Sequence, residues 1–276
     1  SMSDSPSVIF TAYATGILAL IGLCQIFILI SQRTQLRLDW AETYRKRWGE
    51  IRIDWSKVIY FGHSSGDYYQ IATAEVISEI DRMKTERKNT TREIWALEPM
   101  IRVFTELNDI CLRIMQGHLR IGDTYPILGT EFLRQSAAMR GLLDYEYSSR
   151  QGNWGDKEHM DVQRSIRTWL VCHDGIRRRC LILIDMLWAE AVRLEDLPPD
   201  DIRSAANAKI HTGKERKKRL KDEVIRLNGY FSIIRALSLS YFLQHSEYKV
   251  NKYSRGIDAV RLKELEDKWV KRYLEE

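Results

Sequence analysis

The sequence predicts an all-α protein in which a single N-terminal transmembrane helix and stalk precede one cytosolic helical domain. An uncharged apolar run fills residues 8–30, and apolar residues recur at helical spacing in most of the segments that follow. No segment alternates as a strand would. The whole chain contains 44% apolar and 29% charged residues, so the part that follows the apolar run can bury a substantial core. We therefore divide the chain into a short extracytoplasmic tail (1–7), a transmembrane helix (8–30), an amphipathic stalk (31–49) and a cytosolic all-α domain (50–276).

The apolar run from Val8 to Ile30 contains no charged residue. At ~1.5 Å per residue it spans roughly 34 Å, enough to cross a hydrocarbon core of ~30 Å. A buried core helix is the alternative, but such helices are seldom apolar on every side over this length. Basic residues follow the run from Arg33 onward, so we expect a retained single-pass anchor in the inner (plasma) membrane with its N-terminus outside. A cleaved signal peptide would need a basic start and a shorter apolar run.

One face of this predicted helix is small and polar. Spacings of three and four residues place on it the side chains of Thr11, Thr15, Ala19, Gly22 and Gln25. Small residues let helices approach closely, and threonine or glutamine can hydrogen-bond across the contact. An unpaired amide is costly in hydrocarbon, so Gln25 favours a packing face over a chance pattern. We expect the lipid bilayer as one partner and a homo-oligomer in which this face packs between copies or lines a pore.

The pattern of the rest of the chain predicts a series of helices. Leu36, Trp40 and Tyr44 recur every fourth residue, so the membrane helix should continue through the stalk. Trp40 and Trp48 are interpreted as packing residues, with interfacial anchoring as the alternative. Residues 50–66 are ambiguous. Capping and breaker signals then predict a helix begun by Asp67 and others over Pro99–Gly117, Pro126–Tyr147, Lys157–Leu194 (the central core helix), a short stretch after it, Lys214–His245 and Asp258 to the end.

Two basic clusters form a candidate binding surface. It comprises Arg177, Arg178, Arg179, Lys214, Arg216, Lys217, Lys218, Arg219 and Lys221. At the start of a helix the second cluster opposes the macrodipole, so helix stability does not explain it. Such a surface could bind RNA, lipid headgroups or an acidic protein partner, and a solvated charged face is the alternative.

An arginine followed after four to six residues by histidine is the motif of HEPN ribonucleases. The chain contains Arg113 with His118 and Arg167 with His173, although about two matches are expected by chance. The second pair fits better because a polar residue, Thr168, follows its arginine. Arginine would neutralise phosphate charge and histidine would move a proton. A packing histidine and an exposed arginine are the favoured interpretation, so no catalytic residue is assigned.

The sequence offers no other catalytic or metal-binding pattern. The four cysteines are scattered, and no C-x-x-C pair, phosphate-binding glycine loop, G-x-S-x-G or H-E-x-x-H motif occurs. We therefore expect neither a metal nor a cofactor.

The combination of one apolar span, a basic stalk and a helical domain with an Arg–His pair resembles the membrane accessory proteins of type VI-B CRISPR systems. More broadly it is similar to small membrane-anchored helical proteins of bacterial defence, and FTELNDICLRIMQGHLRIGDTYPILGTEF is similar to the helix–loop–helix of a bacterial membrane-anchored family. The resemblance implies a homo-oligomeric antiviral effector or accessory protein whose pore depolarises the inner membrane when a cytosolic protein or RNA partner signals. A membrane-tethered HEPN-like ribonuclease and a non-catalytic scaffold or receptor stay open as alternatives.

Overall fold

The predicted all-α fold is confirmed. The computed structural model describes residues 6–63, 74–86, 96–144, 157–195, 197–210, 213–243 and 259–273, and within these ranges every regular element is a helix. The expected helix start at Asp67 lies outside the described residues.

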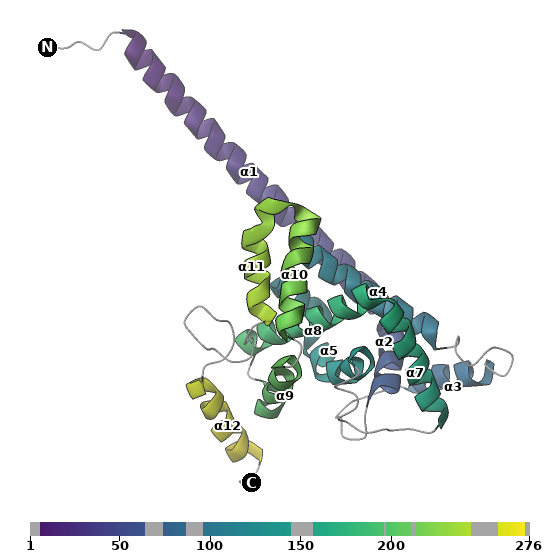
Figure 1. Ribbon diagram of the computed structural model, residues 1–276. Helices are drawn as coiled ribbons and strands as arrows, with labels where there is room; N and C mark the ends of the chain where they lie inside the picture. Colours follow the sequence, from purple (N-terminus) through teal and green to yellow (C-terminus); the bar gives the residue numbers. More distant parts are fainter. Residues whose placement is uncertain are drawn as a thin grey trace.

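The first helix, α1 (Pro6–Glu50), is continuous over 45 residues and contains both the predicted anchor and the predicted stalk. Its N-terminal half projects away from the domain (Figure 1), and large side chains such as Phe10 and Phe27 are exposed there. This helix is long and apolar enough to cross a membrane. Farther along, Ala41, Tyr44 and Trp48 are buried in the domain core, so the domain begins within the stalk.

The domain is built from ten further helices among the described residues. They are α2 (Arg52–Gly62), α3 (Ala74–Glu86), α4 (Leu97–Gln116), α5 (Ile121–Leu143), α7 (Lys157–Cys172), α8 (Asp174–Leu194), α9 (Pro199–Ile210), α10 (Gly213–Asn228), α11 (Ile233–Ser240) and α12 (Ala259–Tyr273). Two short 3-10 turns, Tyr230–Ser232 and Tyr241–Leu243, flank α11.

The central helix of the core is α8, as the apolar stretch in this region predicted. Every residue from Cys180 to Val192 is buried, and the helix packs on α4 and α5. Helix α2 contacts α4 and α5 as well. The approach to α5 is so close that a Cβ on Gly62 would lie 2.2 Å from the carbonyl oxygen of Ala138, so the position requires glycine. An aromatic cluster of Trp48, Trp55 and Phe132 joins α1, α2 and α5.

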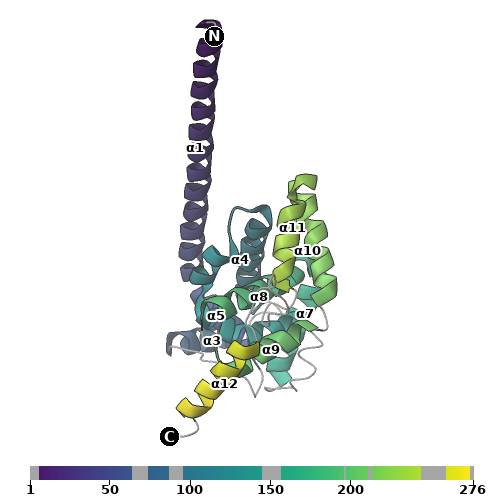
Figure 2. The same cartoon turned by 90° about the vertical axis from the view of Figure 1, so that its left-hand side faces the viewer.

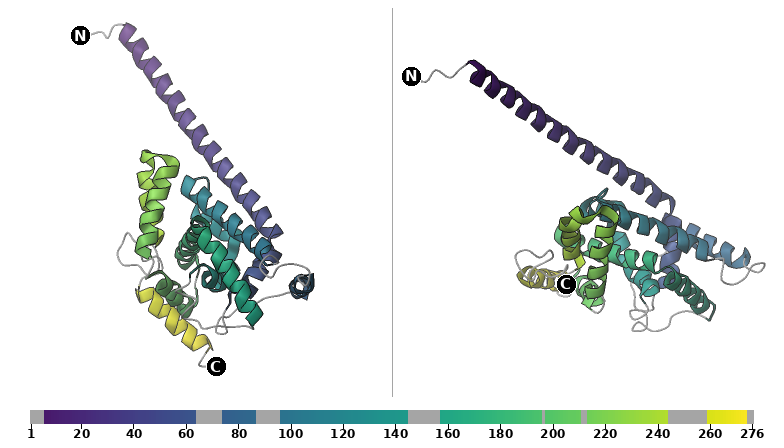
Figure 3. Two further views of the ribbon diagram at one scale, coloured as in Figure 1. Left: turned by 45° about the vertical axis from the view of Figure 1, so that its right-hand side comes forward. Right: turned by 45° about the horizontal axis from the view of Figure 1, so that its top comes forward.

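The prediction of one helix over Lys157–Leu194 is wrong at one point. The chain turns at His173, so α7 and α8 are separate helices that point in different directions (Figure 3). Asp174 begins α8 and pairs with Arg177 and Arg178 in its first turn, where an acidic side chain favours a new helix N-terminus.

The prediction of one helix over Lys214–His245 is also wrong. Gly229 has φ +80°, a left-handed conformation that ends α10 and lets the chain turn back. The result is a hairpin of α10 and α11 that stands beside the rest of the domain (Figures 1 and 3).

A group of three charged side chains is buried between α5, α8 and α10. Asp185 is 1% exposed and forms ion pairs with Arg140 and, at 3.3 Å, with Arg216. Burial lowers the pKa of Arg216, and the carboxylate of Asp185 opposes that shift. One carboxylate therefore balances two buried guanidinium groups.

We expect Asp185→Asn to lower the free energy of unfolding by about 3–5 kcal/mol, because it removes the buried carboxylate that forms ion pairs with both arginines. Asp174→Asn removes an exposed ion-pair partner and should cost about 1 kcal/mol or less. Urea unfolding of the detergent-solubilised chain, followed by circular dichroism, measures both. Equal stability of the two variants would contradict a structural role for the buried group.

Candidate functional site

The polar face predicted in the anchor is open in the structure. Thr11, Thr15, Ala19 and Gln25 are exposed, and a Cβ on Gly22 would have no atom within 4 Å. The hydroxyl of Thr15 donates to the carbonyl of Thr11 at 2.8 Å, which satisfies that hydroxyl within the helix. The side-chain amide of Gln25 has no hydrogen-bond partner among the described residues.

The junction between α1 and the domain is a polar and aromatic cluster around Trp40. The guanidinium of Arg113 lies 4.4 Å from the centre of the Trp40 ring, and the His118 ring stacks on the same indole at 6.1 Å. One turn farther along α1, the buried phenol of Tyr44 donates to Asp109 and accepts from Arg113 at 3.3 Å. Trp40 packs against the core and Trp48 is buried in it, so both are packing residues, as the sequence analysis favoured.

Charges complete this junction. Arg47 on α1 lies 3.9 Å from both Glu106 and Asp109, and Arg37 pairs with Asp123 at 3.0 Å. Burial, helped by the hydrogen bond to Asp109, raises the pKa of Tyr44 to about 12, so the phenol stays protonated as a donor.

We use the name stalk junction for the contacts that α1 residues from Arg37 to Trp48 make with the rest of the domain. Sequence reasoning found its aromatic residues by their spacing but missed their acidic and basic partners, which lie more than 60 positions away.

The candidate Arg–His pair that matches the motif less well is one whose two side chains meet in the structure. Arg113 and His118 do meet, with Nη1 3.5 Å from Nδ1, but both side chains pack on Trp40. Their proximity is explained by the attachment of α1.

The better-matching pair, Arg167 and His173, lies at the end of α7. The Nδ1 of His173 donates to the carbonyl of Trp169 at 2.8 Å, and its ring stacks on that indole at 4.3 Å. Arg167 is half-buried on α7. His173 is therefore oriented by the turn between α7 and α8, which accounts for its position without catalysis.

The first basic cluster is largely neutralised inside the protein. Arg177 and Arg178 pair with Asp174 at 2.6 and 3.1 Å, and Arg178 and Arg179 hold the buried carboxylate of Glu223 on α10. The fold thus brings the two predicted clusters together, with acidic residues between them.

The second cluster occupies the first half of α10, and one member contradicts the prediction. Arg216 is 5% exposed and belongs to the buried group around Asp185, so it is not a surface residue. The side chain of Lys214 lies outside the described residues. Those of Lys218 and Arg219 are exposed, and Lys217 and Lys221 are partly so. The basic surface that results is smaller than the sequence suggested, because periodicity alone does not reveal which arginine of a cluster faces the core.

Metal-binding geometry is missing from the described part of the chain, where no three His, Cys, Asp or Glu side chains gather. Cys111 and Cys180 are fully buried, and burial raises the pKa of both thiols. Buried thiols of this kind are poor nucleophiles.

Comparisons with protein-family models, with curated proteins and with solved structures find no match to this chain. Function is therefore inferred from its own residues.

We expect Tyr44→Phe to destabilise the protein by about 1–2 kcal/mol, because the ring packing stays while the hydrogen bond to a charged carboxylate is lost. The folded-state pKa of about 12 lies above the usual value of 10, so this stabilisation is complete below pH 10 and is lost as the pH rises toward 12. Urea unfolding at pH 8 and pH 11 should give a smaller difference for Tyr44→Phe than for the parent. The exposed Tyr230→Phe serves as the control, and an unchanged stability of Tyr44→Phe at pH 8 would contradict the assignment.

Arg167→Ala and His173→Ala should leave RNA cleavage at the level of the parent protein. The reason is that His173 is held by Trp169 and the match count equals chance. Incubation of labelled RNA with purified full-length protein measures this. Cleavage by the parent that either variant abolishes would instead support the ribonuclease interpretation.

Proposed function

We propose that this protein is a membrane-anchored helical assembly in which copies associate through α1. In this proposal α1 crosses the inner membrane with its N-terminus outside, and the domain lies in the cytoplasm. The support is that the apolar half of α1 is uncovered by any described part of the chain, while Arg33 and Arg37 follow it directly. A soluble protein would not leave so much apolar surface exposed.

The observation that carries self-association is Gln25. Its amide lies well inside the apolar segment, where an unsatisfied polar group costs several kcal/mol. Thr15 bonds to its own helix, so Gln25 is the residue that needs a partner. Gly22 and Gly16 leave open space through which another helix can approach. A second copy of α1 supplies both the close packing and the amide partner.

Through the stalk junction, association of the α1 helices would also affect the position of the domains. Because α1 is continuous and its last turns are buried in the core, anchors that pack together also fix their domains relative to one another. A partner that binds the domain would act on the anchors in the same way. A role as an effector or accessory protein of antiviral defence rests on the resemblance in layout alone.

The alternative of a non-catalytic scaffold or receptor, acting as a single copy, is less well supported. It accounts for the apolar helix and for the helical domain, but it leaves the Gln25 amide without a partner in hydrocarbon.

Gln25→Leu should weaken self-association about 3- to 20-fold, the range expected when one interhelical hydrogen bond is lost in a membrane. Native mass spectrometry of the full-length protein over a range of concentrations in detergent measures this. Leu23→Ile, an apolar change on another face, is the matched control. Identical oligomer populations for Gln25→Leu and the parent would rule out association through this face.

If the copies surround a lumen, the same polar face contacts water, and Gln25→Leu should also reduce ion flux in liposomes. Membrane insertion, checked by resistance to carbonate extraction, should be unchanged. Flux that is equal in the variant and the parent, or absent from both, would leave α1 as an association helix without a conducting role.

A further inference from the structure

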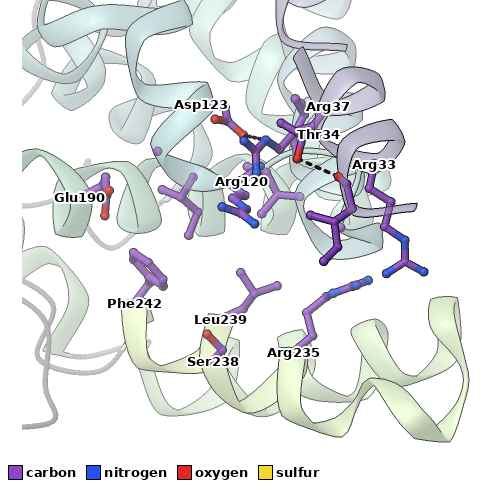
Figure 4. A pocket seen from close by; sticks show the side chains of 16 residues that line it. Arg33, Thr34, Arg37, Arg120, Asp123, Glu190, Arg235, Ser238, Leu239 and Phe242 are labelled. Atoms are coloured by element: carbon purple, nitrogen blue, oxygen red, sulfur yellow. Dashed lines mark hydrogen bonds and ion pairs between the residues drawn. The ribbon is translucent and has the colours of Figure 1, made fainter. Parts of the chain in front are cut away.

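A cavity of about 780 Å³ opens where the apolar run of α1 ends. It lies between α1, the turn that joins α4 to α5, and α11 (Figure 4). Ile30, the last residue of the run, lines it together with four arginines: Arg33, Arg37, Arg120 and Arg235. If α1 spans the membrane, this cavity lies at the surface of the leaflet from which the helix emerges.

The cavity carries excess positive charge. Its two carboxylates are already engaged, because Asp123 pairs with Arg37 at 3.0 Å and Glu190 pairs with Arg193 at 2.7 Å. By contrast, Arg33 and Arg120 form no ion pair with any described residue, and both are exposed. Two guanidinium groups are thus available at the membrane end of the domain.

A third guanidinium is held in place beside them. Arg235 donates through Nη1 to the carbonyl of Gln116 at 2.5 Å, and it lies against Gly117, where a Cβ would approach it to 2.4 Å. Arg33 and Arg235 extend toward one another from α1 and α11, while Arg120 points into the space between the helices (Figure 4). A bound anion would relieve the repulsion among them. Guanidinium groups favour phosphate because their N–H donors match its oxygens.

Apolar side chains also line the cavity, with Leu119, Leu239 and Phe242 among them. A free phosphate ion gains nothing from such walls. A phospholipid matches both the arginines and the apolar lining of the cavity. Its headgroup can bind the arginines, and its glycerol and first methylene groups can pack on the apolar side chains.

The tip of the α10–α11 hairpin supplies a second membrane-facing element. Tyr230, Phe231 and Ile234 are 78%, 103% and 81% exposed, which is unusual for neighbouring large apolar side chains. The hairpin tip lies at the end of the domain from which the N-terminal half of α1 projects (Figures 1 and 2). Because Arg235 lines the same cavity as Ile30, the tip lies level with the end of the apolar run.

We propose that this cavity binds the headgroup of an anionic phospholipid and that the hairpin tip inserts into the same leaflet. The domain then has two membrane contacts, α1 and the hairpin, with the lipid between them. This inference rests on the part of the proposed function in which α1 spans the bilayer, but not on self-association. Lys217, Lys218 and Arg219 of the basic surface lie in the part of α10 away from the hairpin tip, Lys217 being about 18 Å along the helix from Gly229.

The headgroup site is tested with full-length protein in nanodiscs of phosphatidylcholine containing a minor fraction of phosphatidylglycerol. Native mass spectrometry after release measures the lipids retained. Arg33→Gln combined with Arg120→Gln should reduce retained phosphatidylglycerol at least about fivefold, because the two unpaired guanidinium groups are lost. Lys218→Gln combined with Arg219→Gln removes equal charge from the far half of α10 and should leave retention unchanged. Excess glycerol phosphate should not displace the lipid, because it lacks the acyl groups.

Insertion of the tip is tested with a tryptophan at Phe231 and brominated lipids. The added fluorescence of Phe231→Trp should be quenched, whereas that of Val260→Trp, exposed on α12, should not. Equal lipid retention by the Arg33/Arg120 variant, or displacement by glycerol phosphate, would overturn the headgroup site, and an unquenched Phe231→Trp would overturn insertion. Carbonate extraction reports separately on α1: an extracted protein would overturn the membrane span and this inference together, whereas a loss of self-association alone would leave the inference intact.

Discussion

The burial of Tyr44 and Trp48 fixes the direction in which α1 leaves the domain, and much of the structure depends on this constraint. Both side chains lie on the last turns of a continuous helix, and their partners come from α4, α2 and α5. An unbroken helix transmits this fixed orientation to its exposed half. The apolar segment therefore stands clear of the core, and the cavity at Arg33 and the hairpin of α10 and α11 lie on the side toward which it points.

The distribution of charge is the second constraint. The chain carries a formal net charge of +5, yet several of its arginines form ion pairs with buried carboxylates. Asp185 binds two of them and Glu223 binds two more, so carboxylates buried in the core determine where these side chains point. The cations that stay available to a partner include Arg33 and Arg120 near the end of the apolar run, and Lys218 and Arg219 on the distal half of α10. These two sets face different surroundings and invite different partners.

The features on which the proposed self-association and lipid binding depend lie at one end of the molecule. The anchor face with Gln25, the arginine-lined cavity and the exposed hairpin tip all belong to the end from which α1 projects, whereas the candidate Arg–His pairs are occupied by packing on Trp40 and Trp169. Because the stalk junction couples α1 to the domain, the proposed association in the bilayer would also set how the domains are oriented. Lipid bound beside α1 would further restrict how the domain tilts on the surface.

The sequence by itself determined the elements that depend on local pattern. The apolar run, its continuation through Trp40 and Tyr44, the helix begun near Pro99 and ended at Gly117, and the buried stretch of α8 all follow from periodicity and capping between neighbouring residues. The dipeptide Asn228–Gly229 also carried a breaker signal, which the helical spacing on either side obscured. Only the tertiary structure decided that the chain turns at His173, that Arg216 is buried on Asp185, and that Arg33, Arg120 and Arg235 surround one cavity. The last two result from contacts between residues far apart in the chain, and such contacts leave no trace in local periodicity; the turn at His173 is marked by the local pairs of Asp174, which lie within an uninterrupted helical spacing.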